Sequence, residues 1–195
     1  MHSTRPYRHG NLPAALQAAA RRILDENGLH SVGLRETARR VGVSATAAYR
    51  HFASKDDLLA SVAAEGFREL AAAMEGATRG ATPLTRAGLA YIEFAHQNPG
   101  LFRLMFGPIL ADRAKYPPLQ AATARVEALL LTGVADLDQR PLDDNLAATA
   151  AWSLVHGLSH LIVDGFIPAA RAAPQAEEIL AKIRLPRPAA SGPAR

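Results

Sequence analysis

The sequence predicts an all-α protein in two parts, an N-terminal three-helix helix-turn-helix domain and a larger C-terminal helical domain. Apolar residues recur at helical spacings, and no segment alternates apolar and polar residues as a half-buried strand would. Positive charge is concentrated at the N-terminal end. Residues 1–55 carry nine basic and three acidic side chains, a net charge of +6, whereas the whole chain is +4. This excess is typical of a domain that binds a polyanion.

The composition narrows the class of protein. The chain has 195 residues, of which 49% are hydrophobic, so it can bury a sizeable core. It has no cysteine, which excludes disulfides, thiol nucleophiles and cysteine metal sites. No apolar run of about 18 residues is free of polar interruption, and the N-terminus lacks an apolar signal core. We therefore expect a cytoplasmic protein with no cofactor, no metal and no membrane partner.

The chain begins with a polar, basic segment over residues 1–10. This segment is expected either to be a disordered tail or to reach into a minor groove as a basic arm. Asn11 is a good N-cap for a first helix with Pro13 in its first turn. The pattern predicts that this helix extends to about Asn27 and ends at Gly28.

Residues 34–55 predict two short helices that meet at a sharp corner. The apolar residues of 34–41 lie on one helical face, and Gly42 can adopt the left-handed conformation that ends a helix. Ser44 is a good N-cap for a second helix over residues 45–51. Such pairs also occur in bundles with no nucleic-acid role, but the local charge favours DNA binding. The side chains expected to face the groove are those of Ser44, Ala45, Thr46, Tyr49 and Arg50.

Further helices are expected along the rest of the chain. Ser54 caps the first of them, and a loop is expected between Pro168 and Pro174. The predicted ranges are residues 55–80, 83–97, 101–107, 117–133, 142–165 and 175–183. The domain boundaries follow as residues 1–55, residues 56–185 and a disordered tail over residues 186–195.

The predicted helix over residues 142–165 is apolar around most of its circumference. Such a helix needs cover on both sides, and a second copy of the chain is the most economical cover. The small residues Ala147, Ala150, Ser153 and Gly157 would permit close helix approach. The sequence therefore predicts a homodimer.

The same helix carries His156, His160 and Asp164 at intervals of four residues. This spacing aligns two imidazoles and a carboxylate, so a metal site is one interpretation. The apolar neighbours of His156 favour packing and hydrogen bonding instead.

The segment from Tyr7 to Val62, above all GLRETARRVGVSATAAYRHFASKDDLLASV, resembles the DNA-binding domain of the TetR family of transcriptional regulators. Gly33 departs from the family, in which Ser or Thr often caps the first helix of the pair. The resemblance implies that Tyr49, His51 and Lys55 contact phosphates. It places DNA-contact positions at Arg35, Ser44, Ala45, Thr46, Ala47, Tyr49, Arg50, His51 and Lys55.

The C-terminal part resembles one TetR subgroup more loosely, through LFRLMFGP at residues 101–108 and through Trp152, His156 and Gly157. In such regulators this domain dimerises and holds an effector pocket between the long helices. A core role for the same residues is the alternative. The resemblance implies a pocket near Tyr91, Phe94, Phe102, Met105, Phe106, Trp152, His156 and His160.

The functional prediction is a homodimeric repressor that binds palindromic double-stranded operator DNA and is released by a small, largely apolar effector. One alternative is a DNA-binding dimer that is constitutive or answers to a protein partner. Another is an enzyme that uses His156, His160 and Asp164. We do not expect an enzyme, and no catalytic residue is predicted.

Overall fold

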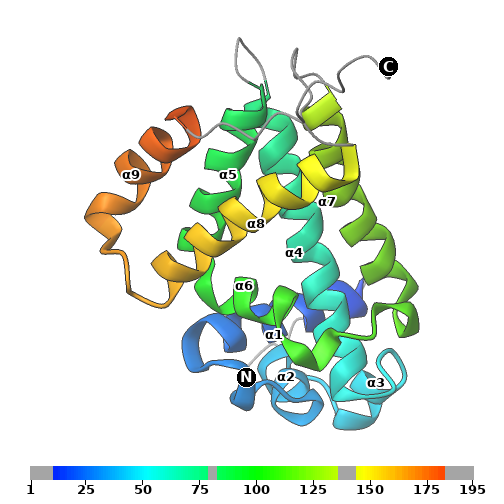
Figure 1. The fold of residues 1–195 in the computed structure, drawn as a ribbon. Helices are drawn as coiled ribbons and strands as arrows, with labels where there is room; N and C mark the ends of the chain where they lie inside the picture. The colour runs from blue at the N-terminus through cyan, green and yellow to red at the C-terminus, as the bar shows by residue number, and fades with distance from the viewer. Residues whose placement is uncertain (1–10, 79–82, 136–143, 183–195) are drawn as a thin grey trace, which may run out of the picture.

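The structure is a computed structural model that describes residues 11–78, 83–135 and 144–182 (Figure 1). All regular structure within these ranges is helical, as predicted. The expected basic arm, the turn at residues 136–141 and the C-terminal tail lie outside the described residues.

Three helices form one end of the molecule (Figure 1): α1 (Leu12–Asn27), α2 (Leu34–Val41) and α3 (Ala45–Tyr49). We call this part the reading head. The 3-10 turn η1 (Leu29–Ser31) joins α1 to α2. The side chain of Asn11 accepts a hydrogen bond from the backbone N–H of Ala14, which confirms the predicted start of α1.

Helix α4 (Lys55–Ala77) connects the reading head to the rest of the molecule. Its predicted cap is confirmed, because Ser54 Oγ accepts a hydrogen bond from the backbone N–H of Asp57 at 3.0 Å. The first turns of α4 pack on α1, and Gln17 donates from its side chain to the carbonyl of Ser61. The later turns pack on α5 and α7. One hydrophobic core therefore extends from the head into the body.

The body contains five further helices, α5 (Pro83–Gln97), α6 (Pro99–Phe106), α7 (Pro117–Ala135), α8 (Asp144–Val163) and α9 (Ala169–Lys182). Two 3-10 turns, η2 (Pro108–Leu110) and η3 (Arg113–Lys115), lie between α6 and α7. Helix α8 crosses the front of the body between α5 and α7, and α9 lies on the outer side of α5 (Figure 1). Helix α6 lies between the reading head and α8.

Two helices begin earlier than predicted. Helix α6 starts at Pro99, because proline fits the first helical position, where its missing N–H is not needed. The loop expected between Pro168 and Pro174 is wrong, since α9 starts at Ala169 and continues through Pro174. An interior proline removes one backbone hydrogen bond. The buried contacts of Ala172 and Ala176 against α5 offset that loss.

By length and composition alone, one stretch of α8, Leu146–Val163, could cross a membrane. A core helix of a globular domain meets the same criteria, and α8 packs against α5 and α7. Only 33% of the stretch is buried within the chain. Two of its large apolar residues, Leu146 and Leu161, are exposed in a single copy.

Candidate nucleic-acid interface and aromatic cluster

The corner between α2 and α3 forms as the sequence predicts. Gly42 has φ 79° and ψ 31°, the left-handed conformation that a side chain disfavours. The next N–H, of Val43, donates to the carbonyl of Ala38 at 3.0 Å. Ala38 and Ala48 are buried at the crossing, and their small size lets the two helices approach closely.

Helix α3 presents one face to the core and the opposite face to solvent. Ala48 is 0% exposed, so the helical repeat directs Thr46 and Arg50 away from the core. Tyr49 beside them is 50% exposed, although it is a large aromatic residue. Ser44 caps the helix, with its Oγ accepting from the N–H of Ala47 at 3.2 Å.

Helix α3 ends at Tyr49, two residues before the predicted end. The N–H groups of His51 and Phe52 both donate to the carbonyl of Ala48, which tightens the last turn. The chain turns here because the Phe52 side chain returns to the core.

Three arginines of the reading head are paired within the fold: Arg21 with Asp25 and Glu69, Arg40 with Glu26 and Glu36, and Arg39 with Glu36. The guanidinium of Arg39 donates to Glu36 at 2.7 Å, and that of Arg40 donates to the same carboxylate at 3.3 Å. The hydrogen bond from Arg39, with help from Arg40, lowers the pKa of Glu36 to about 2. Glu36 is therefore charged at neutral pH and holds both arginines.

Arg35 and Arg50 differ from these paired arginines. Both are exposed, and neither forms an ion pair with another residue that the structure describes. Their charges are available to an external anion.

Lys55 is half-buried at the start of α4. Its Nζ donates to the carbonyl of Leu29 at 3.3 Å, a contact that the sequence did not reveal. Two of the three donors of the ammonium group are left for a phosphate. Of the nine predicted DNA-contact residues, six are exposed and three, Ala45, Ala47 and Lys55, are half-buried.

The structure brings most of the predicted ligand-site residues together as packed rings, which we call the aromatic cluster. Its members are Tyr91, Phe102, Phe106, Trp152, His156 and His160. Phe106 contacts four of the others, and its ring centroid lies 4.6 Å from that of His156.

The other two predicted residues lie apart from these rings. Met105 is fully buried against α4, where a Cβ added to Gly66 would lie 2.7 Å from its sulfur. Phe94 is also buried, and it makes no ring contact with the part of the chain that the structure describes.

A hydrogen-bonded chain crosses the cluster. Trp152 Nε1 donates to the Tyr91 hydroxyl at 3.2 Å, and that hydroxyl lies 2.9 Å from His156 Nδ1. Because the indole N–H can only donate, we assign the Tyr91 proton to a bond with His156 Nδ1. His156 is then neutral, with its proton on Nε2. Burial, and secondarily the nearby His160, lowers the pKa of His156 to about 4.

The row of His156, His160 and Asp164 does not converge on one point. His156 faces Tyr91, whereas Asp164 accepts a hydrogen bond from Arg103 at 2.9 Å. That bond holds the pKa of Asp164 below its usual value. Within the described ranges, no group of three metal-ligating side chains is close enough to hold an ion.

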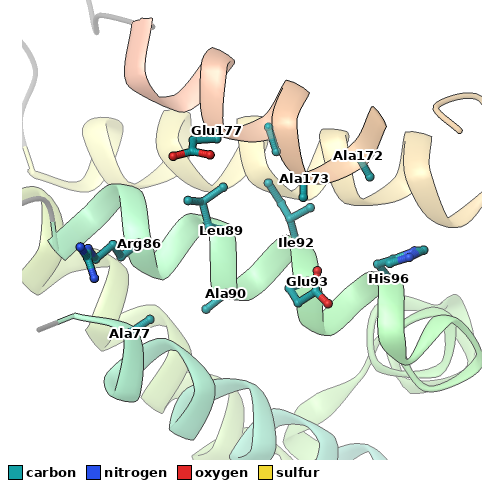
Figure 2. Close-up of a pocket in the computed structure, with 11 residues that line it drawn as sticks. Ala77, Arg86, Leu89, Ala90, Ile92, Glu93, His96, Ala172, Ala173 and Glu177 are labelled. Carbon is teal, nitrogen blue, oxygen red and sulfur yellow. The ribbon is translucent and has the colours of Figure 1, made fainter. Parts of the chain in front are cut away.

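An open groove of about 390 Å³ lies elsewhere, between α5 and α9 (Figure 2). Leu89, Ile92 and the alanines of both helices form its apolar floor, and Arg86, Glu93, His96 and Glu177 form its polar edges. None of the eight predicted ligand-site residues lines it. These groove residues lie on the opposite face of α5 from Tyr91.

Sequence reasoning missed Arg113, which lies between the helices predicted over residues 101–107 and 117–133. The structure packs its guanidinium over the ring of Phe67, 5.0 Å from the centroid, and 6.0 Å from that of Phe106. The spacing of residues around Arg113 does not point to Phe67, because that ring belongs to α4, which is distant in the chain.

Two family models match the chain. The one described as "Bacterial regulatory proteins, tetR family" matches residues 16–62, from α1 into α4. The one described as "Tetracyclin repressor-like, C-terminal domain" matches residues 84–183, which is half of the chain. Together they cover the reading head and most of the body.

Solved structures share this fold over most of the chain. A protein of unknown function from Rhodococcus sp. RHA1 is 28% identical with a TM-score of 0.77, over 90% of this chain and 96% of its own. The TetR family transcriptional regulator PfmR from Thermus thermophilus is 26% identical with a TM-score of 0.59, over 87% and 94%. The fatty acid degradation regulator FadR from Bacillus halodurans, at 16% identity and a TM-score of 0.63, shows the fold alone, over 88% and 95%.

Members of this family regulate transcription by binding DNA and are generally not enzymes. The capped α3 helix, its exposed face and the family matches agree with one another. The chain belongs to the TetR family of transcriptional regulators, and its helix-turn-helix is the DNA-binding element.

Proposed function

We propose that the protein is a homodimeric cytoplasmic repressor that binds a palindromic operator and is released by a small, largely apolar effector. We place it in the subgroup with the Trp152, His156 and Gly157 pattern, with its DNA-binding domain ending where α4 begins. The main observation behind the proposal is that Thr46, Tyr49 and Arg50, at and beside α3, are exposed to solvent. An exposed tyrosine beside unpaired arginines suits a phosphate backbone and base edges better than it suits solvent.

The outer face of α8 supports the pairing of two copies. Its exposed stripe carries Leu146, Ser153, Gly157 and Leu161, with large apolar groups at both ends. Ala147, by contrast, is buried within the chain and cannot take part. A Cβ on Gly157 would meet no atom within 4 Å, so a second helix can approach closely there. A two-fold pair would set two α3 helices on successive major-groove turns, about 34 Å apart.

Helix α6 gives the effector a route to the reading head besides α4. At its start, Asn98 accepts a hydrogen bond from Arg21 of α1 at 2.6 Å. At its other end, Phe102 and Phe106 belong to the aromatic cluster. An effector that moves these rings moves the helix that abuts α1. The effector would then bind the form with displaced heads better than the form that fits DNA.

The tight packing of the cluster favours a second candidate, a DNA-binding dimer without a small-molecule effector. Tyr91 and Phe102 are fully buried and fill their own space. Calorimetry against a metabolite library separates the two, because a resident site gives saturable heat and the alternative gives none.

DNA binding is tested on operator fragments selected from genomic DNA. Arg35→Ala should weaken operator binding by about 1–3 kcal/mol and relax sequence discrimination. Lys55→Ala should weaken binding to all sequences and reduce the salt slope by roughly 1. Arg39→Ala is the control, since Arg39 is already paired with Glu36. Normal binding by both the Arg35 and Lys55 variants in a salt titration would refute this interface.

Dimerisation is tested by mass in solution. Gly157→Arg should convert the dimer to monomers without loss of helix, because the site is open in a single copy. Gly76→Arg is the control, since Gly76 is equally open but lies on α4. A monomeric wild-type protein, or a Gly157→Arg protein that remains dimeric, would contradict the proposed pairing.

A further inference from the structure

Arg113 has few partners for a half-buried cation. Its guanidinium has five N–H donors, and one of its nitrogens donates to the carbonyl of Met105 at 3.2 Å. Within the described ranges it forms no ion pair with a carboxylate. Burial lowers its pKa below the usual value, and Glu127 opposes this only through space. A desolvated guanidinium with spare donors is a strong partner for an incoming carboxylate.

Phe106 lies between Arg113 and the hydrogen-bonded chain of the cluster. Its centroid is 6.0 Å from the guanidinium carbon, 4.6 Å from the His156 ring and 6.3 Å from the Trp152 ring. The ring is half-buried, whereas Tyr91 and Phe102 are 0% exposed. Phe106 is therefore the ring of these three that is partly exposed to solvent.

The polar groups around Phe106 are arranged for a ligand with one anionic end. Arg113 offers a cation 6.0 Å from the centroid of the ring. His156 packs against the same ring, and its Nδ1 accepts from Tyr91, which leaves its Nε2 proton as a donor. The remaining walls are the aromatic rings of Phe67 and Trp152. A flat body with a carboxylate matches this set better than a neutral or cationic molecule does.

We propose that this site binds a compact organic acid, whose carboxylate pairs with Arg113 and whose apolar ring or chain takes the place of the Phe106 side chain against His156 and Trp152. The inference rests on the proposed effector-regulated function and names the chemical class of the effector. Binding would turn Phe106 out of the cluster and so shift α6, which touches α1.

The first experiment is chemical rescue in the variant Phe106→Ala. Removal of the ring should lower the melting temperature, and benzoate should restore more of it than benzamide, which has the same shape without the charge. In the double variant Phe106→Ala, Arg113→Gln the two probes should act equally. Phe106→Leu serves in the same comparison should the alanine variant not fold. Equal rescue by benzoate and benzamide while Arg113 is present would overturn the proposal.

The second experiment uses the protein with all rings of the aromatic cluster intact and measures binding directly. Trp152 is the single tryptophan of the chain and lies in the cluster, so its emission reports on the site. Benzoate, phenylacetate and hexanoate are titrated beside their amides. At least one acid should give a saturable change in emission, and it should bind about 10-fold or more tightly than its amide. The variant Arg113→Gln should bind that acid about 10-fold or more weakly than the wild type does. Arg125→Gln, which removes an exposed pair with Glu75, should bind like wild type.

The outcomes separate this inference from the proposed function. Neither experiment uses DNA, so the site is refuted if no acid changes Trp152 emission or if Arg113→Gln binds as well as wild type. Operator binding is then measured with the acid that bound most tightly. An acid that binds through Arg113 but leaves the operator complex intact would uphold the site and refute release by effector.

Discussion

The reading head and the aromatic cluster are both formed where helices cross, but side chains of opposite size form the two crossings. In the head, Ala38 and Ala48 lie at the contact, and charged groups pair over short stretches of chain, as Glu36 does with Arg39 and Arg40 does with Glu26. In the cluster, large rings fill the contact, and Tyr91 finds its partner His156 65 residues away. The head is therefore specified locally, whereas the cluster depends on the whole body being folded.

Because of this difference, we expect substitutions in the cluster to change mainly stability and substitutions on the outer face of the head to change mainly DNA binding. Small residues leave the contact between α2 and α3 little apolar area to lose, and the outward side chains of α3 are available to DNA. The cluster buries much more apolar surface and holds its polar atoms inside, so changes there act on folding first. Four changes test this contrast, from the largest expected effect to the smallest.

Truncation of the most enclosed ring should have the largest effect. Phe102 is 0% exposed and contacts four rings, among them Phe106 at 4.9 Å. Phe102→Ala should lower the free energy of unfolding by about 3–5 kcal/mol in urea titration. Tyr49→Ala in the head should change it by less than about 1 kcal/mol, because Tyr49 is half exposed, yet should weaken DNA binding. Similar losses of stability for the two variants would remove the contrast.

The second change is in pH. The pKa of His156 falls from 6.5 to about 4 on folding, so below pH 6.5 the unfolded chain binds a proton that the folded chain does not. Stability should fall by roughly 1–3 kcal/mol as the pH drops from 6.5 to 4, and the slope from this group should end there. The lowered pKa of Glu36 adds to the loss of stability from about pH 4.5 downward, at the acid end of this window, and that of Asp164 adds to it below the window.

Urea titrations across this pH range measure the effect. His156→Asn, which keeps an acceptor for Tyr91 but does not titrate, should flatten the profile. An unchanged slope in that variant would show that another group is responsible.

The third change removes the hydrogen bond between Arg21 of the head and Asn98 at the start of α6. Asn98 accepts from Arg21 of the head and donates to the carbonyl of Phe94 at 2.9 Å. Asn98→Ala should lower the free energy of unfolding by about 1–2 kcal/mol, since both bonds are partly buried. Gln97→Ala is the matched control, because Gln97 is exposed and bonds only within its own helix. Equal effects at the two positions would show that the bridge to the head contributes nothing.

The smallest expected effect is a gain. Thr37 in the head is 0% exposed, and its hydroxyl has no hydrogen-bond partner among the described residues. Thr37→Val keeps the shape and removes the unsatisfied hydroxyl, so it should stabilise the protein by about 1 kcal/mol. Thr123→Val in the body should instead destabilise, since that buried hydroxyl donates to Leu119 at 2.9 Å. Thermal unfolding measures both, and destabilisation by Thr37→Val would reveal a partner for the hydroxyl.

Features fixed by neighbouring residues could be read directly from the sequence. Asn11, Ser44 and Ser54 cap helices as predicted, and Gly42 takes the left-handed conformation at the corner. Each depends on atoms within a few residues of the chain, so the pattern is sufficient. The assignment of DNA contacts to α3 has the same basis and stays a prediction about a complex.

Features that join distant segments could not be read in this way. Six of the eight predicted ligand-site residues do meet, but no pattern in the sequence indicates that their own rings fill the space. The hydrogen bond from Lys55 to the carbonyl of Leu29 is not indicated by the residues around it. The same is true of the hydrogen bond from Arg21 to Asn98. Arg113 is the clearest example, because its contact with Phe67 joins segments 46 residues apart in the chain.

By itself the sequence determined the helical class, the helix-turn-helix and the excess of positive charge around it, because periodicity, capping and composition act over short distances. Only the tertiary structure decided which arginines are neutralised, which face of α8 is left uncovered and which rings enclose His156. Those outcomes depend on helices that are far apart in the chain and meet only when the core is packed.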